Sequence, residues 1–100
     1  MELILFADTT NNSESDPWVH AGIVATGSTG FDGNLIFATD GTGTRSSDTS
    51  GLTERMRITH DGNVGIGTNS PDRNMHIKSN TLCELKLESS NAGDSFLNIK

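Results

Sequence analysis

The chain has 100 residues, a single cysteine and a formal net charge of −6. A negative chain lacks the cationic surface that nucleic-acid phosphates or an anionic membrane surface would require, so we expect neither as a partner. No long apolar run is present in the sequence, so we also expect no membrane insertion.

The apolar supply is small for a self-sufficient domain. Leu, Ile, Val and Phe together make up about a fifth of the chain, close to the level at which composition begins to indicate disorder. A domain of this size buries only about 60–65% of its surface when it folds alone, so its stability is marginal. Because one cysteine cannot form an intrachain disulfide, we expect oligomerisation to supply the missing stability.

Residues 1–51 have the pattern of a hairpin-rich β segment. Three apolar stretches are bounded by polar or glycine residues, and we expect a strand in each: residues 3–7, 18–26 and 34–39. Asp32-Gly33 precedes the third strand, and Asp-Gly favours a two-residue hairpin turn because both of its positions need positive φ. We therefore expect residues 21–26 to pair with residues 34–39 through a longer loop. Residues 40–51, rich in Gly, Ser, Thr and Asp, predict a mobile surface loop.

Residues 52–78 contain the most regular pattern in the chain. Two predicted strands, residues 55–59 and 63–67, flank Asp61-Gly62, which indicates a second tight turn. Ser70-Pro71 then ends the second strand, since proline cannot continue a central ladder. We expect one more short strand at residues 74–78.

Two internal repeats support a repetitive β architecture. The stretch from Phe31 to Thr39 aligns with the stretch from His60 to Thr68, and each has Asp-Gly-Asn followed by two apolar residues with one residue between them. Asp61 lies 29 residues after Asp32. A looser repeat relates Glu2-Leu3-Ile4-Leu5 to Glu84-Leu85-Lys86-Leu87. A short period nested in a longer one is typical of repetitive folds, so we predict an all-β chain in which residues 79–100 begin a further β repeat, with strands at 82–88 and 96–100.

Alternation with a period of two gives each predicted strand about two inward apolar residues. That number is too small for a two-layer sandwich built from one chain, but it suits a narrow core to which three chains each contribute one wall. Glycines leave one face of the second strand in residues 52–78 without bulk, which permits close approach of another backbone. We therefore predict assembly contacts at Met56, Ile58, Val64, Gly65, Ile66, Gly67, Met75 and Ile77.

The order of small and apolar residues in this stretch is specific. It runs Thr53-Glu54-Arg55-Met56-Arg57-Ile58, then Asp61-Gly62-Asn63-Val64-Gly65-Ile66-Gly67-Thr68, then Ser70-Pro71 and Met75-His76-Ile77. This order resembles a module of bacteriophage tail fibres and tailspikes, over about residues 52–78. The resemblance implies an elongated homotrimer whose β-strands are intertwined or stacked around a threefold axis, like a triple β-helix or β-prism.

The resemblance also implies a function. It points to a structural virion component of the tail fibre, assembled in the host cytoplasm, with other tail proteins as further partners. One alternative is that loops at residues 8–17 and 40–51 bind a host surface glycan or protein. Another is a fragment of a polysaccharide depolymerase, which would need two carboxylates roughly 5–10 Å apart in a groove. Asp8, Glu14, Asp16 and Asp94 all lie in turn-like segments, so we predict no catalysis.

We expect no cofactor and no bound metal. His76 is the histidine that we consider as a ligand, because three copies of an axial imidazole can hold an ion in a homotrimer. His76 alternates with Met75 and Ile77, and we favour a solvent-facing ring over an axial one. Arg57 has two interpretations: an ordinary ion pair on a strand face, or a bond to carbonyls or to Asp61 of a neighbouring chain that fixes the register.

Overall fold

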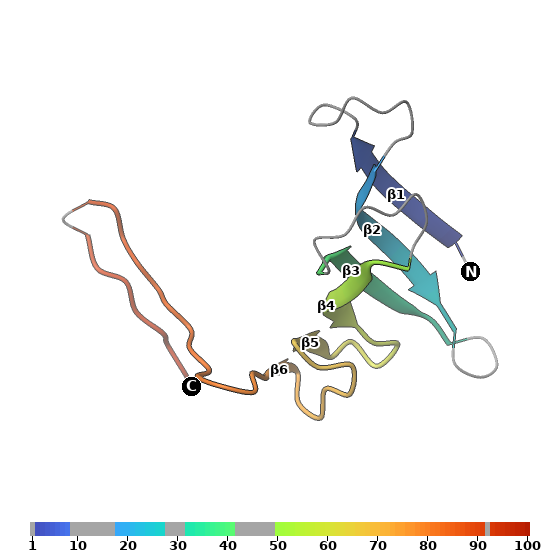
Figure 1. The fold of residues 1–100 in the computed structure, drawn as a ribbon. Helices are drawn as coiled ribbons and strands as arrows, with labels where there is room; N and C mark the ends of the chain where they lie inside the picture. Colours follow the sequence, from blue (N-terminus) through green and yellow to red (C-terminus); the bar gives the residue numbers. More distant parts are fainter. Residues whose placement is uncertain (1, 9–17, 28–31, 42–49, 92) are drawn as a thin grey trace.

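The computed structural model describes residues 2–8, 18–27, 32–41, 50–91 and 93–100. These residues form one six-stranded sheet with the strands in chain order, followed by an extended segment (Figure 1). They contain no helix, so the predicted all-β class is confirmed. The strands are β1 (Glu2–Asp8), β2 (Trp18–Thr26), β3 (Asn34–Asp40), β4 (Leu52–Ile58), β5 (Val64–Ile66) and β6 (Met75–Ile77).

Strands β1 to β5 form an antiparallel meander. The β2–β3 pairing runs from Ala21 opposite Thr39 to Thr26 opposite Asn34, which confirms the predicted partners. Strand β4 begins earlier than predicted because Leu52 pairs with Asp40 at the end of β3. Most of the loop predicted at residues 40–51 lies outside the described residues.

The β4–β5 hairpin closes through a three-residue loop. The Gly62 N–H donates to the Thr59 carbonyl over 2.8 Å, and the Thr59 N–H donates to the Asn63 carbonyl over 2.9 Å. Gly62 has a φ of 84°, while no described residue other than glycine has a positive φ. The prediction of a two-residue turn with both Asp61 and Gly62 in that region is therefore wrong. A type I turn followed by one left-handed glycine gives the same reversal without straining Asp61.

The earlier Asp-Gly pair is used differently. Asp32 and Gly33 lie at the end of the longer β2–β3 connection, immediately before Asn34 begins β3. Gly33 does not have a positive φ, so this glycine is not needed for a left-handed turn. The two Asp-Gly-Asn copies thus share their place before a strand but not their backbone conformation.

Strand β6 pairs with β5 in parallel, with Gly65 opposite His76. The connection between them, residues 67–74, passes over Gly65: a Cβ there would lie 2.6 Å from the Thr68 carbonyl oxygen and 3.4 Å from the Pro71 Cβ. Gly67 has a φ of 74°, and a Cβ on it would collide with the Lys78 carbonyl. The close backbone approach predicted at both glycines is therefore made within the chain, and their contacts with other chains stay a prediction.

Residues 79–100, which we call the arm, contain no strand among their described positions. The strands predicted at residues 82–88 and 96–100 are therefore wrong for the single chain. Figure 1 shows the arm leaving the sheet beyond β6 and turning back on itself. The radius of gyration is 17.2 Å, against about 13 Å for a compact domain of 100 residues. The two extended limbs stand away from the sheet, so no apolar layer covers them, and an isolated pair of extended limbs is at best marginally stable as a ladder in water.

The sheet is a single layer with a thin core. Among the described residues the buried hydrophobic side chains are Val19, Ile36 and Ala38, and no large side chain is fully buried. A soluble chain of this size normally buries many more. The fold therefore leaves most of the apolar side chains whose burial is described partly or fully in contact with solvent.

Candidate assembly site

The register places most apolar side chains of the sheet on one face. Residues directly opposite each other on neighbouring strands point to the same side, so the pairing can be followed from β1 to β6. Two rows cross all six strands, one from Ile4 to Ile77 and the other from Glu2 to Met75. We call their ten large apolar members the apolar face: Ile4, Ile23, Leu35, Phe37, Met56, Ile58, Val64, Ile66, Met75 and Ile77.

None of the ten residues of the apolar face is buried. Ile4 and Met75 are 59% exposed, and Leu35 and Ile66 are 38% exposed. The other six are half-buried, because neighbouring side chains in the same layer shield them. Large contiguous apolar surfaces on soluble proteins often mark interaction sites, so the apolar face is a candidate for one.

Six of the eight residues predicted for assembly lie on the apolar face: Met56, Ile58, Val64, Ile66, Met75 and Ile77. The other two, Gly65 and Gly67, do not belong to it. Gly65 lies on the opposite side of β5, where it is buried under the connection to β6. Gly67 follows β5 and donates its N–H to the Arg55 carbonyl over 3.0 Å.

Sequence reasoning missed four members of the apolar face: Ile4, Ile23, Leu35 and Phe37. The 29-residue repeat contained the signal for two of them, because Leu35 corresponds to Val64 and Phe37 to Ile66. The structure places each of these pairs on the same side of the sheet. Ile23 follows from its position opposite Phe37, which requires the register and not the sequence alone.

The opposite side of the sheet carries an ion pair between Arg57 and Glu54. Arg57 Nε and Nη2 donate to the two Glu54 carboxylate oxygens, each over 2.7 Å. The Glu54 hydrogen bond raises the pKa of Arg57, with partial burial acting in the other direction. This geometry supports the ordinary ion-pair interpretation of Arg57, since its partner lies three residues away in the same strand.

Polar residues from both Asp-Gly-Asn copies lie together at one end of the sheet. The His60 ring lies between two carboxylates, with Nδ1 3.7 Å from Asp32 Oδ2 and Nε2 3.3 Å from Asp61 Oδ1. The His60 N–H donates to Asn34 Oδ1 over 3.1 Å. The predicted turn residues Asp32, Gly33, Asp61 and Gly62 therefore meet at one end of the sheet.

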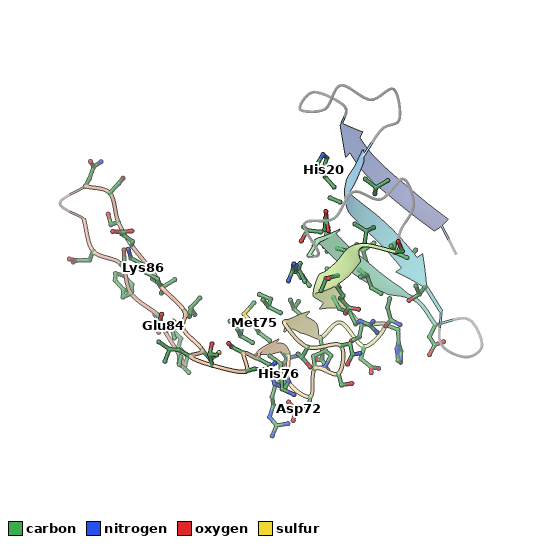
Figure 2. All side chains as sticks on the ribbon, viewed as in Figure 1. His20, Asp72, Met75, His76, Glu84 and Lys86 are labelled. Carbon is green, nitrogen blue, oxygen red and sulfur yellow. The ribbon has the colours of Figure 1, made fainter. Side chains whose placement is uncertain are left out.

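His76 lies on the side of β6 that faces away from Met75 and Ile77 (Figure 2). Its Nδ1 is 3.2 Å from Asp72 Oδ1. Nowhere in the described ranges do three His, Cys, Asp or Glu side chains gather closely enough to hold a metal ion. If the apolar face turns inward in an assembly, His76 turns outward, so the geometry favours the solvent-facing interpretation.

The carboxylates considered for catalysis are not brought together by the described part of the chain. Glu14 and Asp16 lie outside the described residues, and Asp94 is exposed on the arm. A polar cavity of about 320 Å³ lies between β4 and the β5–β6 connection, lined by Thr53, Glu54, Gly67, Thr68 and Asn69. Its one carboxylate, Glu54, already accepts both hydrogen bonds from Arg57, so the cavity lacks the pair that glycoside hydrolysis requires.

No family model and no curated protein matches this chain. Within the ranges that the structure describes, no helix is long and apolar enough to cross a bilayer.

Proposed function

We propose that this chain is a structural segment of a homotrimeric bacteriophage tail fibre, without catalytic activity. Three copies turn their apolar faces toward a common axis and bury them against one another. The resulting rod holds a receptor-binding element away from the virion, in contact with other tail proteins. The resemblance of residues 52–78 to the fibre module supports the virion assignment.

The observation that carries the proposal is the uncovered apolar face on a single-layer sheet. Covering a half-exposed Ile or Leu side chain gains on the order of 1 kcal/mol, and each copy offers ten large apolar residues on one side. The opposite side is occupied by the Arg57–Glu54 pair and by the β5–β6 connection. That opposite side also carries the buried side chains Ile36 and Ala38, so the apolar face is the side whose large apolar residues are left uncovered.

Met75 provides a sharp test because it is 59% exposed in the single chain. Met75→Asp therefore costs the isolated sheet little, but it places a charge in the shared core of the assembly. The control is Asn74→Asp, which adds the same charge at the neighbouring exposed position. Light scattering coupled to size exclusion measures the molar mass of each protein.

We expect the unmodified chain and Asn74→Asp to have about three times the 10.6 kDa chain mass and Met75→Asp to have the mass of one chain. A single-chain mass for the unmodified protein at micromolar concentration would overturn the homotrimer. A trimeric Met75→Asp variant would show that the apolar face is not the contact.

A second candidate function is binding of a host glycan or protein at one end of the sheet. Asp8 pairs with Trp18, and Asp40 pairs with Leu52, so the two longest connections leave the sheet at the same end. Replacing residues 42–49 with a short Gly-Ser linker tests this function. Loss of host adsorption by a variant that still forms trimers would favour it over a purely structural role.

The depolymerase alternative has a direct assay. Purified chain is incubated with capsular or O-antigen polysaccharide, and reducing ends are measured over time. We expect none to appear. Their appearance, with dependence on one Asp or Glu, would contradict the structural proposal.

A further inference from the structure

We infer that the arm is a second assembly element, in which residues 82–88 and 94–99 pair with the arms of the other copies of this chain. This inference rests on the proposed homotrimer and adds a contact that the sheet does not make. The partner is a second copy, and the contact is a β-ladder with an apolar side turned toward the axis.

The first limb of the arm is amphipathic with a period of two. Leu85 and Leu87 alternate with Glu84, Lys86 and Glu88, two of which are labelled on the arm in Figure 2. Lys86 Nζ lies 2.8 Å from Glu88 Oε2, and both side chains are at least two-thirds exposed. The charged side is therefore solvated as it stands, whereas the leucine side is the one that gains from a partner.

The arm exposes apolar side chains along both limbs. Six large ones are at least half exposed, which is unusual for so short a segment: Leu82 at 72%, Leu85 at 63%, Leu87 at 50%, Phe96 at 76%, Leu97 at 66% and Ile99 at 82%. Lys86, Leu87 and Glu88 line a common cavity with Asp94, Ser95 and Phe96, so the two limbs lie side by side there. They still cover little of each other's apolar surface.

The backbone of the arm is also without a ladder. The last backbone hydrogen bond to the sheet among the described residues runs from the Lys78 N–H to the Ile66 carbonyl over 2.9 Å. Beyond Lys78, the described positions form no strand pairing. An extended segment with alternating apolar residues and no ladder can pair with a strand of another chain.

The position of the arm indicates that its partner is a second copy of the chain. The arm projects beyond β6 and away from the sheet (Figure 1), out of reach of its own apolar face. Met75 and Ile77 of β6 belong to that face, and the first apolar residue of the arm, Leu82, follows β6 after four polar residues, 78–81. Because three apolar faces cover one another in the homotrimer, the arms at the end of that face are left to meet one another around the same axis.

Hydrogen exchange measured by mass spectrometry on the full chain tests the inference. We expect peptides covering residues 82–88 and 94–99 to exchange at least about 100-fold more slowly than unstructured chain, as amides in a ladder do. The Leu85→Ser/Leu87→Ser variant should lose most of that protection. The matched control is Glu84→Ser/Glu88→Ser, on the charged side of the same limb, which should keep it.

A nitroxide label on Cys83 gives a second measurement, because this is the only cysteine and its side chain is exposed. Labels on arms that meet should broaden one another's spectra, and mixing with unlabelled chain should remove the broadening. A trimer with unprotected arm amides and no broadening would overturn the arm contact and leave the homotrimer standing. A single-chain mass in light scattering would instead overturn the homotrimer itself.

Discussion

The backbone N–H of His60 donates to the side-chain oxygen of Asn34 over 3.1 Å. These two residues belong to different copies of the Asp-Gly-Asn repeat, and the bond joins the entry to β3 with the turn between β4 and β5. Strands β3 and β5, which follow the two Asp-Gly pairs, flank β4. The two copies of the repeat therefore contact each other in the folded chain, and each copy also leads into a strand on the same sheet.

We expect Asn34→Ala to destabilise the chain by about 0.5–1 kcal/mol, since it removes one solvent-accessible hydrogen bond. Denaturant unfolding at fixed chain concentration measures the change, and the slope with denaturant should stay constant. Asn80→Ala is the control, because Asn80 is exposed and makes no comparable described contact across the sheet. Equal midpoints for the two variants would contradict a role for the Asn34–His60 bond.

The two left-handed glycines should differ in their tolerance of alanine. Nothing lies within 4 Å of a Cβ added to Gly62, so Gly62→Ala carries only the cost of its backbone conformation, about 1–2 kcal/mol. Gly67→Ala carries that cost and a collision with the Lys78 carbonyl, which adds at least about 1 kcal/mol. Thermal unfolding of both variants under the same conditions gives the ranking. A Gly67→Ala variant as stable as Gly62→Ala would show that the backbone there yields easily.

Gly65 makes a different prediction because it lacks a positive φ. Gly65→Ala should cost about 1–3 kcal/mol by crowding the Thr68 carbonyl, and Gly65→Val should cost more. The amides of Val64 and Lys78, which bind the Asn74 and Ile66 carbonyls, should exchange faster as β6 loosens.

Gly33→Ala is the control for Gly65, since its Cβ would approach nothing closer than 3.9 Å. We expect it to be near neutral. Unchanged melting and normal amide exchange in Gly65→Val would mean that the connection between β5 and β6 does not depend on this glycine.

The Arg57–Glu54 pair should show a coupling energy of about 0.5–2 kcal/mol in a double-mutant cycle, because both side chains are partly buried and the contact has two hydrogen bonds. Arg57→Lys should recover only part of it, since an ammonium cannot match both oxygens. The pKa of Arg57 is raised above its ordinary value, so its stabilisation is fully present below that value. We expect the same coupling at pH 7 and pH 10; a fall at pH 10 would contradict this.

Strand positions were predictable where the alternation and the turn residues agreed. Strand β2 was predicted at its observed bounds, and the Ala21–Thr26 pairing with β3 followed from the turn signal. The conformation of Asp61 was not predictable from the Asp-Gly pair, because a type I turn with one left-handed glycine uses the same residues. The parallel pairing of β6 was not predicted, since its ladder is only three residues long and depends on how residues 67–74 cross the sheet.

The candidate site was predictable in part. Alternation placed Met56, Ile58, Val64 and Ile66 on shared faces, and the register added their neighbours on β1 to β3. The roles of Gly65 and Gly67 were not predictable, because absence of a side chain indicates close approach without indicating which backbone approaches. In the arm, the alternation of apolar and polar residues predicted strands at 82–88 and 96–100, but the described residues of the single chain form no ladder there.

The parallel step from β5 to β6 determines the direction in which the chain travels. In an antiparallel meander of six strands, the last strand would finish at the end where the first one began. Here β6 runs the same way as β1, β3 and β5, so the chain enters the sheet at one end and leaves it at the other. The sheet therefore carries the polypeptide forward along the strand direction by about one strand length. A fold of this kind can be repeated in tandem, and the length of such an array would grow in proportion to the number of copies.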